Sequence, residues 1–364
     1  MTISIIVGTR PEIIKMSPII HECERLNLDY FTLHTGQHYS YNMDQIFFNQ
    51  LEIPQPKFNL DIGSGSHAEQ TAKILIGVEK VLQKENSNIV LVEGDTNTVL
   101  AGALTAAKLH IPVGHVEAGL RSYDRTMPEE INRVLTDHIS DYLFCPTKES
   151  AGNCKKEGLP KKFIHITGNT IVDAVNKNIV ISNKKSNIIA ELELEKEEYI
   201  LMTCHRQENV DNAERFSNIL NAVKEIDFPI VYPIHPRAKK MASKFGLLKK
   251  VPPHLKLIKP IGYLDILQLA NNARLIVTDS GGIQEEACIL RRPCLTIREN
   301  TERPETIKVK SNKIIGWKKE NIIKEISYSL NKKKKISYQN PFGNGHAGGK
   351  ILHIIMRNEN HAKL

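Results

Sequence analysis

The sequence predicts an α/β protein of two Rossmann-like domains, each with a parallel sheet, facing a central cleft. Three observations support this prediction. Short β-rich runs alternate with segments of helical periodicity, which is the pattern of parallel sheets covered by helices. The alternation occurs twice, before and after a polar stretch at residues 176–198. The length of 364 residues suits two domains better than the alternative, one large doubly wound sheet.

The first alternating set fills the N-terminal half. Its β-rich runs are followed by turn-forming or helical segments, as in βαβ units. We expect strands at Ile3–Val7, Tyr30–Thr35, Ile89–Glu93, Val113–Glu117, Tyr142–Cys145 and Phe163–Ile166, and helices at Ile13–Leu26 and Thr98–Lys108.

Residues 176–198 are rich in Asn, Lys and Glu and have a weak pattern, so they are the expected boundary region. A second alternating set follows them. We expect its strands at Tyr199–Thr203, Ile230–Pro233, Leu255–Ile258, Leu275–Thr278 and Cys294–Ile297, and a helix in the tail at Ala347–Met356.

The composition, with 41% hydrophobic and 25% charged residues, is that of a soluble globular protein. Much of the net charge of +8 lies in lysine runs, and no aromatic stacking pattern or DNA-binding motif accompanies it. The charge therefore predicts a solvated face that attracts anionic substrates, and no nucleic-acid binding.

No apolar run approaches the ~20 residues that span a bilayer, and the N-terminus lacks signal-peptide features, so we expect no membrane binding and a cytoplasmic location. The six cysteines form no Cys-x-x-Cys pair and predict buried thiols without a metal site.

Ligands of open α/β sheets bind beyond the carboxyl ends of the strands, and a polar cluster follows the first expected strand there. Thr9 and Glu12 fit a capping box. Arg10 and Lys15 place two cations near a helix N-terminus, which favours a phosphate or carboxylate site over plain solvated charges. The loop after Gly8 is not Gly-x-Gly-x-x-Gly, so no dinucleotide cofactor is expected.

Two acidic residues follow neighbouring strands of the first set. Asp95 and Glu117 are expected to face one cleft, where a pair of carboxylates suits proton transfer. Each has a structural alternative, because Asp95 suits a helix N-cap and Glu117 suits an ion pair with Arg121.

A third acidic candidate lies at the start of the helix expected after Met127. Glu129 and Arg133 are four residues apart and share a helix face, which suits a surface ion pair. The neighbouring acidic positions keep a catalytic role for Glu129 open.

Two clusters in the second set match an anionic ligand. His205 and Arg206 follow its first strand, in the right place for a charged leaving group. Ser280, Gly281 and Gly282 come between a strand and a helix and predict a phosphate cradle, with Glu286 one turn further on to accept hydrogen bonds from ribose hydroxyls. Residues that follow the next strand are expected to edge the same pocket: Arg298, Thr301, Glu302 and Arg303.

Taken together and in order, these motifs resemble the non-hydrolysing UDP-N-acetylglucosamine 2-epimerase family, from Gly8 to about Gly349. The matching segments are Gly8–Glu12, Glu93–Thr96, His115–Gly119, Pro128–Arg133, His205–Asn209, Asp279–Glu286 and Thr301–Glu305. The resemblance implies a GT-B-like fold, a homodimer and no cofactor. It implies a first domain over residues 1–170, completed by a C-terminal helix at about 350–364, and a UDP-binding domain over residues 171–349.

The resemblance also implies roles for single residues. Ser280, Gly281, Gly282 and Glu286 would hold the diphosphate and ribose, Arg10 and His205 would contact the phosphates, and Arg303, Lys15 and Arg133 would complete the substrate site. Asp95, Glu117 and Glu129 would be the acid/base groups, with His205 assisting the leaving group. UDP would leave C1 as a base removes the C2 proton of UDP-N-acetylglucosamine, giving 2-acetamidoglucal. Re-addition with a proton on the opposite face would give UDP-N-acetylmannosamine.

Some family members are activated by their own substrate at a second site, which Gln37, His38 and His235 would form here. Family members commonly carry Arg at the position of Gln207, a departure that bears on this activation. The alternatives are a hydrolysing 2-epimerase that releases N-acetylmannosamine and UDP, a GT-B UDP-sugar glycosyltransferase, and an anion- or nucleic-acid-binding protein. The last of these leaves the carboxylates unexplained.

Overall fold

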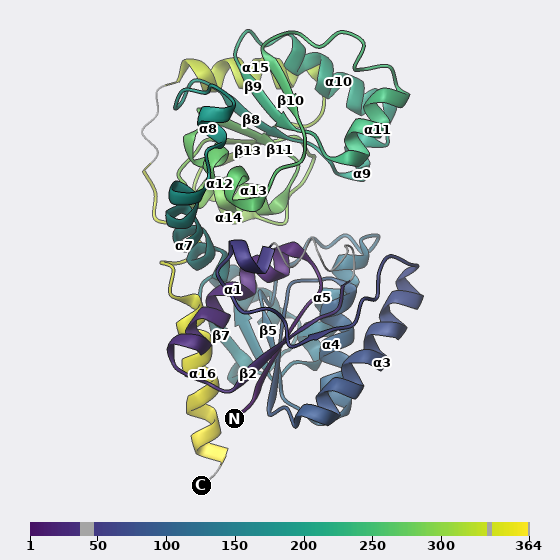
Figure 1. Cartoon of the computed structure of the whole chain (residues 1–364), viewed down its shortest axis with the longest axis vertical. Helices are drawn as coiled ribbons and strands as arrows, with labels where there is room; N and C mark the ends of the chain where they lie inside the picture. The colour runs from purple at the N-terminus through teal and green to yellow at the C-terminus, as the bar shows by residue number, and fades with distance from the viewer. Residues whose placement is uncertain (37–46, 333–336, 363–364) are drawn as a thin grey trace. The chain divides into compact units, whose positions relative to one another are not determined.

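The protein, a computed structural model, is described over residues 1–36, 47–332 and 337–362 (Figure 1). It divides into two compact units. Unit 1 contains residues 1–176 and 342–364, and unit 2 contains residues 177–341. The boundaries predicted from the sequence were 170 and 349, and the helix α7 (Thr170–Lys185) runs unbroken across the first of them.

Unit 1 is built on a parallel sheet of seven strands in the order β3-β2-β1-β4-β5-β6-β7. Its strands are β1 (Ile3–Val7), β2 (Tyr30–His34), β3 (Phe58–Asn59), β4 (Ile89–Glu93), β5 (Val113–Val116), β6 (Tyr142–Cys145) and β7 (Ile164–Ile166). Its helices are α1 (Arg10–Arg25), α3 (His67–Glu85), α4 (Asn97–Lys108), α5 (Pro128–Ile139), α6 (Lys148–Lys156), the first part of α7, and α16 (Ala347–Ala362), with a short 3-10 turn at Lys161–Phe163.

The core of unit 1 forms because its strands are apolar on both faces, as expected for a parallel sheet covered by helices. Ile6, Leu33 and Val92 lie on the face that packs against α3 and α4, where Ile74 and Val99 meet them. This packing fixes the carboxyl ends of β1 and β4, from which the candidate site is built.

Helix α16 lies beside α1 in unit 1 (Figure 1). The two helices approach so closely at Gly348 that a Cβ there would stand 3.1 Å from the carbonyl carbon and oxygen of Pro18. The Gly348 N–H also donates a hydrogen bond of 3.0 Å to Asp173. A side chain at this position would crowd the backbone of α1, so the close approach favours glycine.

Unit 2 is built on a parallel sheet of six strands in the order β10-β9-β8-β11-β12-β13. Its strands are β8 (Ile200–Thr203), β9 (Ile230–Pro233), β10 (Leu255–Ile258), β11 (Leu275–Thr278), β12 (Cys294–Thr296) and β13 (Asn312–Ile314). Its helices are α8 (Ile188–Glu191), α9 (Gln207–Val210), α10 (Ala213–Lys224), α11 (Pro236–Lys244), α12 (Tyr263–Asn272), α13 (Gly281–Ile289), α14 (Pro304–Lys308) and α15 (Lys319–Asn331), together with the rest of α7. Buried side chains cover both faces of this sheet as well.

The predicted α/β class with two parallel sheets is confirmed, and every predicted strand is present within one residue at each end. Residues 176–198, expected as a boundary region of weak pattern, contain the end of α7 and all of α8, and the division between the units falls at their start. The short strands β3 and β13, one in each sheet, were not predicted from the sequence. Within the described residues, no helix has both the length and the apolar character needed to cross a membrane.

Candidate active site

Both sheets reverse their strand order at one point, between β1 and β4 in unit 1 and between β8 and β11 in unit 2. Loops leave the sheet in opposite directions at such a switch point and open a crevice beyond the strand ends. The first polar cluster and Asp95 lie at the switch point of unit 1, and His205 and Ser280 lie at that of unit 2.

In unit 1, Lys15 lies on α1 between two buried carboxyl groups. Its ammonium forms an ion pair with Glu117 and stands 3.3 Å from Oε1 of Glu93. Burial raises the pKa of Glu93 well above its ordinary range, and the nearby carboxylate of Glu117 adds to the shift although Lys15 opposes it. Lys15, predicted from the sequence as a substrate-binding residue, is thus the counter-charge of Glu117. Glu93 is a buried acid that was not predicted as a site residue from the sequence.

Glu117 directly follows β5 and has a left-handed backbone with φ of 72°. Non-glycine residues rarely adopt this conformation, and such strain concentrates at functional sites. The Glu117 N–H donates to the carbonyl of Phe144, and the side-chain amide of Asn169 donates a bond of 3.3 Å to the Glu117 carboxylate. The suggested ion pair with Arg121 is wrong, because Arg121 pairs with Asp137 and Glu157.

Asp95 lies between β4 and α4, as expected, but it does not cap the helix. The N-cap of α4 is Thr96, whose hydroxyl accepts from the N–H of Val99. The Asp95 carboxylate forms an ion pair with Arg133 of α5, which also contacts Glu130 at 2.8 Å. Arg133 therefore holds one of the predicted acid/base groups.

Glu129 is exposed at the first turn of α5, next to Glu130, which is buried. The suggested partner of Glu129, Arg133, contacts Glu130 and Asp95. Exposure leaves the Glu129 carboxylate accessible to a ligand.

Glu12 forms the base of the loop that follows β1. Its carboxylate accepts hydrogen bonds from the Gly8 N–H at 2.6 Å, the Thr9 hydroxyl at 2.9 Å and the Thr96 hydroxyl at 2.8 Å. Burial raises the pKa of Glu12 to about 7, although these hydrogen bonds oppose the shift. The predicted capping box is wrong in its bonding, because Thr9 stands at the N-cap without a side-chain hydrogen bond to the helix backbone.

The guanidinium of Arg10, at the start of α1, lies 5.1 Å from the ring centre of Phe47. Stacking on an aromatic ring is a common way to fix an arginine at a binding site. Gln37 and His38, predicted as part of an activating site, lie outside the described residues.

In unit 2, the predicted phosphate cradle is the N-terminus of α13. Ser280 caps this helix by accepting from the Ile283 N–H. A Cβ added at Gly281 or Gly282 would have no neighbour closer than 3.9 Å, so packing does not require glycine at either position. Glu286 is buried one turn further on, and its carboxylate, after burial itself, raises the pKa of the Tyr263 phenol.

His205 and Arg206 are held by Asp279, a fully buried carboxylate that the sequence analysis did not assign. Asp279 accepts from the backbone N–H groups of His205 and Arg206, each at 3.0 Å, and from the side-chain amide of Asn209 at 3.1 Å. The His205 ring nitrogen Nδ1 lies 3.4 Å from Asp279 Oδ1. The signal that could have found Asp279 is its position, directly after a strand and directly before the cap of α13.

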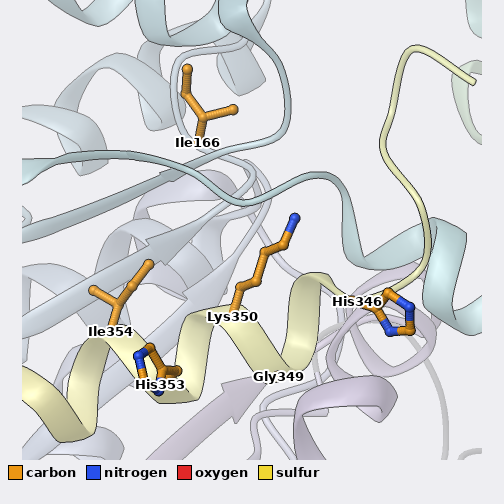
Figure 2. Close-up of a pocket in the computed structure, with 6 residues that line it drawn as sticks. All are labelled: Ile166, His346, Gly349, Lys350, His353 and Ile354. Atoms are coloured by element: carbon orange, nitrogen blue, oxygen red, sulfur yellow. The ribbon is translucent and has the colours of Figure 1, made fainter.

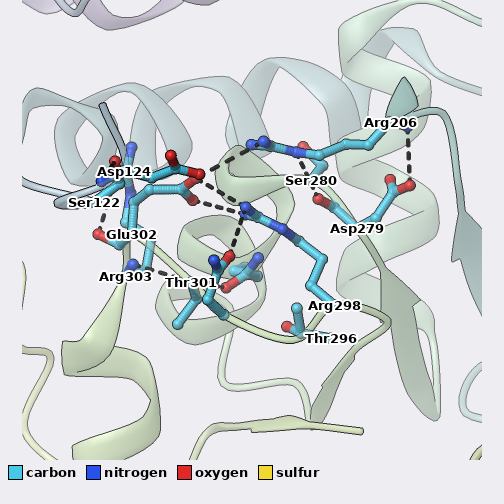
Figure 3. Close-up of polar contacts among 12 residues, drawn as sticks. Ser122, Asp124, Arg206, Asp279, Ser280, Thr296, Arg298, Thr301, Glu302 and Arg303 are labelled. Carbon is cyan, nitrogen blue, oxygen red and sulfur yellow. Dashed lines mark hydrogen bonds and ion pairs between the residues drawn. The ribbon is translucent and has the colours of Figure 1, made fainter. Parts of the chain in front are cut away.

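Arginines gather around Glu302 beside this loop (Figure 3). Arg298 donates two hydrogen bonds of 2.7 and 3.0 Å to Glu302, and Arg206 lies 3.8 Å away. Although burial opposes the shift, the Arg298 hydrogen bond lowers the pKa of Glu302 to about 2. Arg303, predicted to border the pocket, pairs with Glu285 at 2.7 Å.

His235 lies beside His205, with 5.8 Å between ring centres. Its Nδ1 accepts from the Arg237 N–H at the start of α11, and burial together with His205 lowers the pKa of His235. Its role in substrate activation stays a prediction.

A shallow groove of about 360 Å³ lies along α16 in unit 1 (Figure 2). Its lining residues are Ile166, His346, Gly349, Lys350, His353 and Ile354. These six include none of the predicted site residues, so the groove is separate from the crevice at the β1–β4 switch point.

The comparisons with known sequences, family models and solved structures agree on one family. The family model described as UDP-N-acetylglucosamine 2-epimerase matches residues 21–356. A UDP-N-acetylglucosamine 2-epimerase of Methanocaldococcus jannaschii is 55% identical over 98% of this chain and 99% of its own. A UDP-2,3-diacetamido-2,3-dideoxy-D-glucuronate 2-epimerase of Pseudomonas aeruginosa is 39% identical over 98% of this chain and all of its own. The crystal structure of the M. jannaschii enzyme in complex with UDP-GlcNAc and UDP has a TM-score of 0.90, covering 98% of this chain and 100% of that one. The GT-B-like fold is thereby confirmed.

Proposed function

Because the chain belongs to the UDP-N-acetylglucosamine 2-epimerase family, we propose that it interconverts UDP-N-acetylglucosamine and UDP-N-acetylmannosamine without releasing the sugar. The observation that carries this proposal is the grouping of Glu117, Lys15 and Asp95 at the carboxyl edge of the sheet of unit 1.

In this proposal, the reaction is an elimination followed by a re-addition. A carboxylate removes the C2 proton as the C1–oxygen bond to UDP breaks, and 2-acetamidoglucal forms. UDP then re-adds at C1 while a second acid delivers a proton to the opposite face of C2. Asp95, Glu117 and Glu129 are the proposed acid/base groups, and the backbone strain at Glu117 supports a functional role for that residue.

We assign the diphosphate to unit 2. The N–H groups at the start of α13, with Ser280, Gly281 and Gly282, suit a phosphate, and we assign Arg10 and His205 as its further ligands. In this assignment Glu286 binds the ribose and Arg303 closes the site. Departure of UDP is charge-stabilised in this way, which assists loss of a weakly acidic C2 proton.

A homodimer through unit 1 is part of the proposal. Ile131 and Leu135 lie four residues apart on one face of α5, and both are 47% exposed. Exposed apolar side chains on one helix face are typical of a surface that contacts another protein. Light scattering of purified protein should give twice the monomer mass of 41.1 kDa, and Leu135→Lys should lower it.

The test is proton NMR of the purified protein with UDP-N-acetylglucosamine in D2O. We expect UDP-N-acetylmannosamine that carries deuterium at C2. Release of free N-acetylmannosamine and UDP would instead assign the hydrolysing reaction. Asp95→Asn and Glu117→Gln should lower kcat by about 100- to 10,000-fold, whereas the exposed Glu69, which only caps α3, should tolerate Gln.

A further inference from the structure

His115 was part of a sequence motif, yet the proposed function gives it no role. Its side chain and that of Asp137 are both 0% exposed. His115 Nδ1 lies 2.6 Å from Asp137 Oδ1, and Nε2 lies 2.8 Å from the carbonyl oxygen of Gly94. Both partners carry acceptor oxygens, so each ring nitrogen of the buried imidazole faces a hydrogen-bond acceptor.

Asp137 makes a second set of contacts through its other oxygen. Oδ2 accepts from the Gly119 N–H at 3.1 Å and pairs with Arg121 at 2.7 Å. Although burial opposes the shift, the charges of His115 and Arg121 hold the pKa of Asp137 below its ordinary range. The Asp137 carboxylate is therefore a fixed anion inside unit 1.

The two glycines that this pair holds flank the proposed acid/base groups. Gly94 immediately precedes Asp95, and Gly119 comes two residues after Glu117. Both glycines have left-handed backbones, with φ of 89° and 80°. Neither loop is part of a strand, so its position depends on hydrogen bonds of this kind.

We infer that His115 and Asp137 form one clamp that fixes both acid/base loops relative to each other, and that they are positioning residues for the proposed epimerisation. The inference rests on the proposed function for its catalytic consequence. The clamp connects the end of β4, the end of β5 and the last turn of α5 through one buried contact between the His115 and Asp137 side chains. A displacement of about 1 Å at a reacting group lowers the rate on the order of 100-fold. We expect a fall of this size when the clamp is removed.

Two variants of His115 separate its two bonds. In His115→Gln the amide nitrogen sits near the position of Nε2 and keeps the donor to Gly94, whereas in His115→Asn it sits near Nδ1 and keeps the contact with Asp137. Asp137→Asn removes the charge. The control is Asp141→Asn, because Asp141 makes a similar bond of 2.9 Å to the Val113 N–H, at the opposite end of β5.

We expect His115→Asn and Asp137→Asn to lower kcat by about 100-fold, with KM and the Kd for UDP within about threefold, because unit 2 holds the nucleotide. His115→Gln should keep more activity than His115→Asn. Asp141→Asn should lose stability without this fall in kcat. Equal kcat in all four variants and the wild type, or an equal fall for Asp141→Asn, overturns the inference.

Hydrogen exchange followed by mass spectrometry gives a reading that needs no substrate. Removing the clamp should speed exchange in both loops, at residues 94–97 and 117–120, and Asp141→Asn should leave them unchanged. If a variant of Asp137 fails to fold, His115→Gln should still loosen residues 117–120 more than residues 94–97. Unchanged exchange in both loops of a folded variant contradicts the clamp. If the loops of the variants exchange faster but the wild type is inactive as an epimerase, only the proposed function is contradicted.

Discussion

Lys15 illustrates how a residue's neighbours decide its role. Its ammonium lies between Glu93 and Glu117 inside unit 1. Removal of one partner from a buried ion pair leaves an uncompensated charge.

We expect Lys15→Met to lower the free energy of unfolding by about 3 kcal/mol at pH 8. The loss should be smaller at pH 6, because the buried carboxyl groups then take up protons more readily. Urea titrations at both pH values measure it. The control is Lys57→Met, which breaks a surface ion pair with Glu85 and should cost less than about 1 kcal/mol. Equal losses in the two variants would contradict the assignment of Lys15 as a buried counter-charge.

Glu12 gives a prediction of pH dependence. Its pKa is raised from 4.5 to about 7 in the folded protein, so the folded state binds this proton more tightly than the unfolded state. Its contribution to stability is therefore fully present below pH 4.5 and is lost as the pH rises through 7. Glu12→Gln has no such group, so it should gain about 2.5 kcal/mol relative to wild type between pH 5 and pH 8. Denaturation curves at both pH values test this, and a constant difference would exclude it.

For single residues, the sequence predicts which positions belong to the site better than it predicts which side chains they contact. Asp95 and Glu117 were found because acidic residues after parallel strands face one crevice. The ion pairs of Lys15 and Arg133 could not be predicted, because sequence spacing does not give distances between α1 and β5 or between α5 and the end of β4.

The segment that leads from β1 into α1 depends on a glycine for its packing. A Cβ at Gly8 would stand 2.1 Å from the Thr98 hydroxyl oxygen and 2.3 Å from that of Thr35. We expect Gly8→Ala to destabilise unit 1 by about 3 kcal/mol, as measured by chemical denaturation. Gly152→Ala, in α6 with open space around it, should instead stabilise by about 0.5–1 kcal/mol. Two effects of the same sign would show that packing is not the cause.

Helix α13 allows binding to be tested apart from folding. Gly281 and Gly282 have room for a methyl group, so Ala at either position should leave the melting temperature unchanged within about 2 °C. If their backbone lies against a diphosphate, the same methyl group would weaken UDP binding by about tenfold or more. Calorimetric titration with UDP measures this. Unchanged affinity in Gly281→Ala and Gly282→Ala would move the diphosphate away from α13.

Element prediction succeeded where burial and periodicity agree. Ile3–Val7 and Leu275–Thr278 are central strands that are buried throughout, and both were predicted to the residue. The strands β3 and β13 are edge strands of two and three residues, too short to produce a pattern. Residues 176–185 form the second half of α7, where exposed polar side chains on one side of the helix obscured its helical period in the sequence.

At the scale of the whole molecule, the two units have separate cores, so a ligand that binds one should stabilise that one. UDP at 100 times its Kd should add about 2.7 kcal/mol. We expect hydrogen exchange to slow in the strands of unit 2, such as β8 and β11, and much less in β1 and β4. An equal slowing in both units would place the nucleotide's main contacts elsewhere.

The return of the chain to unit 1 through α16 has a consequence for its synthesis on a ribosome. Residues 342–364 complete unit 1, yet they are translated only after all of unit 2. At 5–20 residues per second, α1 waits on the order of ten seconds or more for the helix that covers it at Pro18. During that time its apolar side is open to chaperones and to other nascent chains. A stop codon just before Ala347 should therefore yield a chain whose second unit is intact and whose first unit is retained by the folding machinery of the cell.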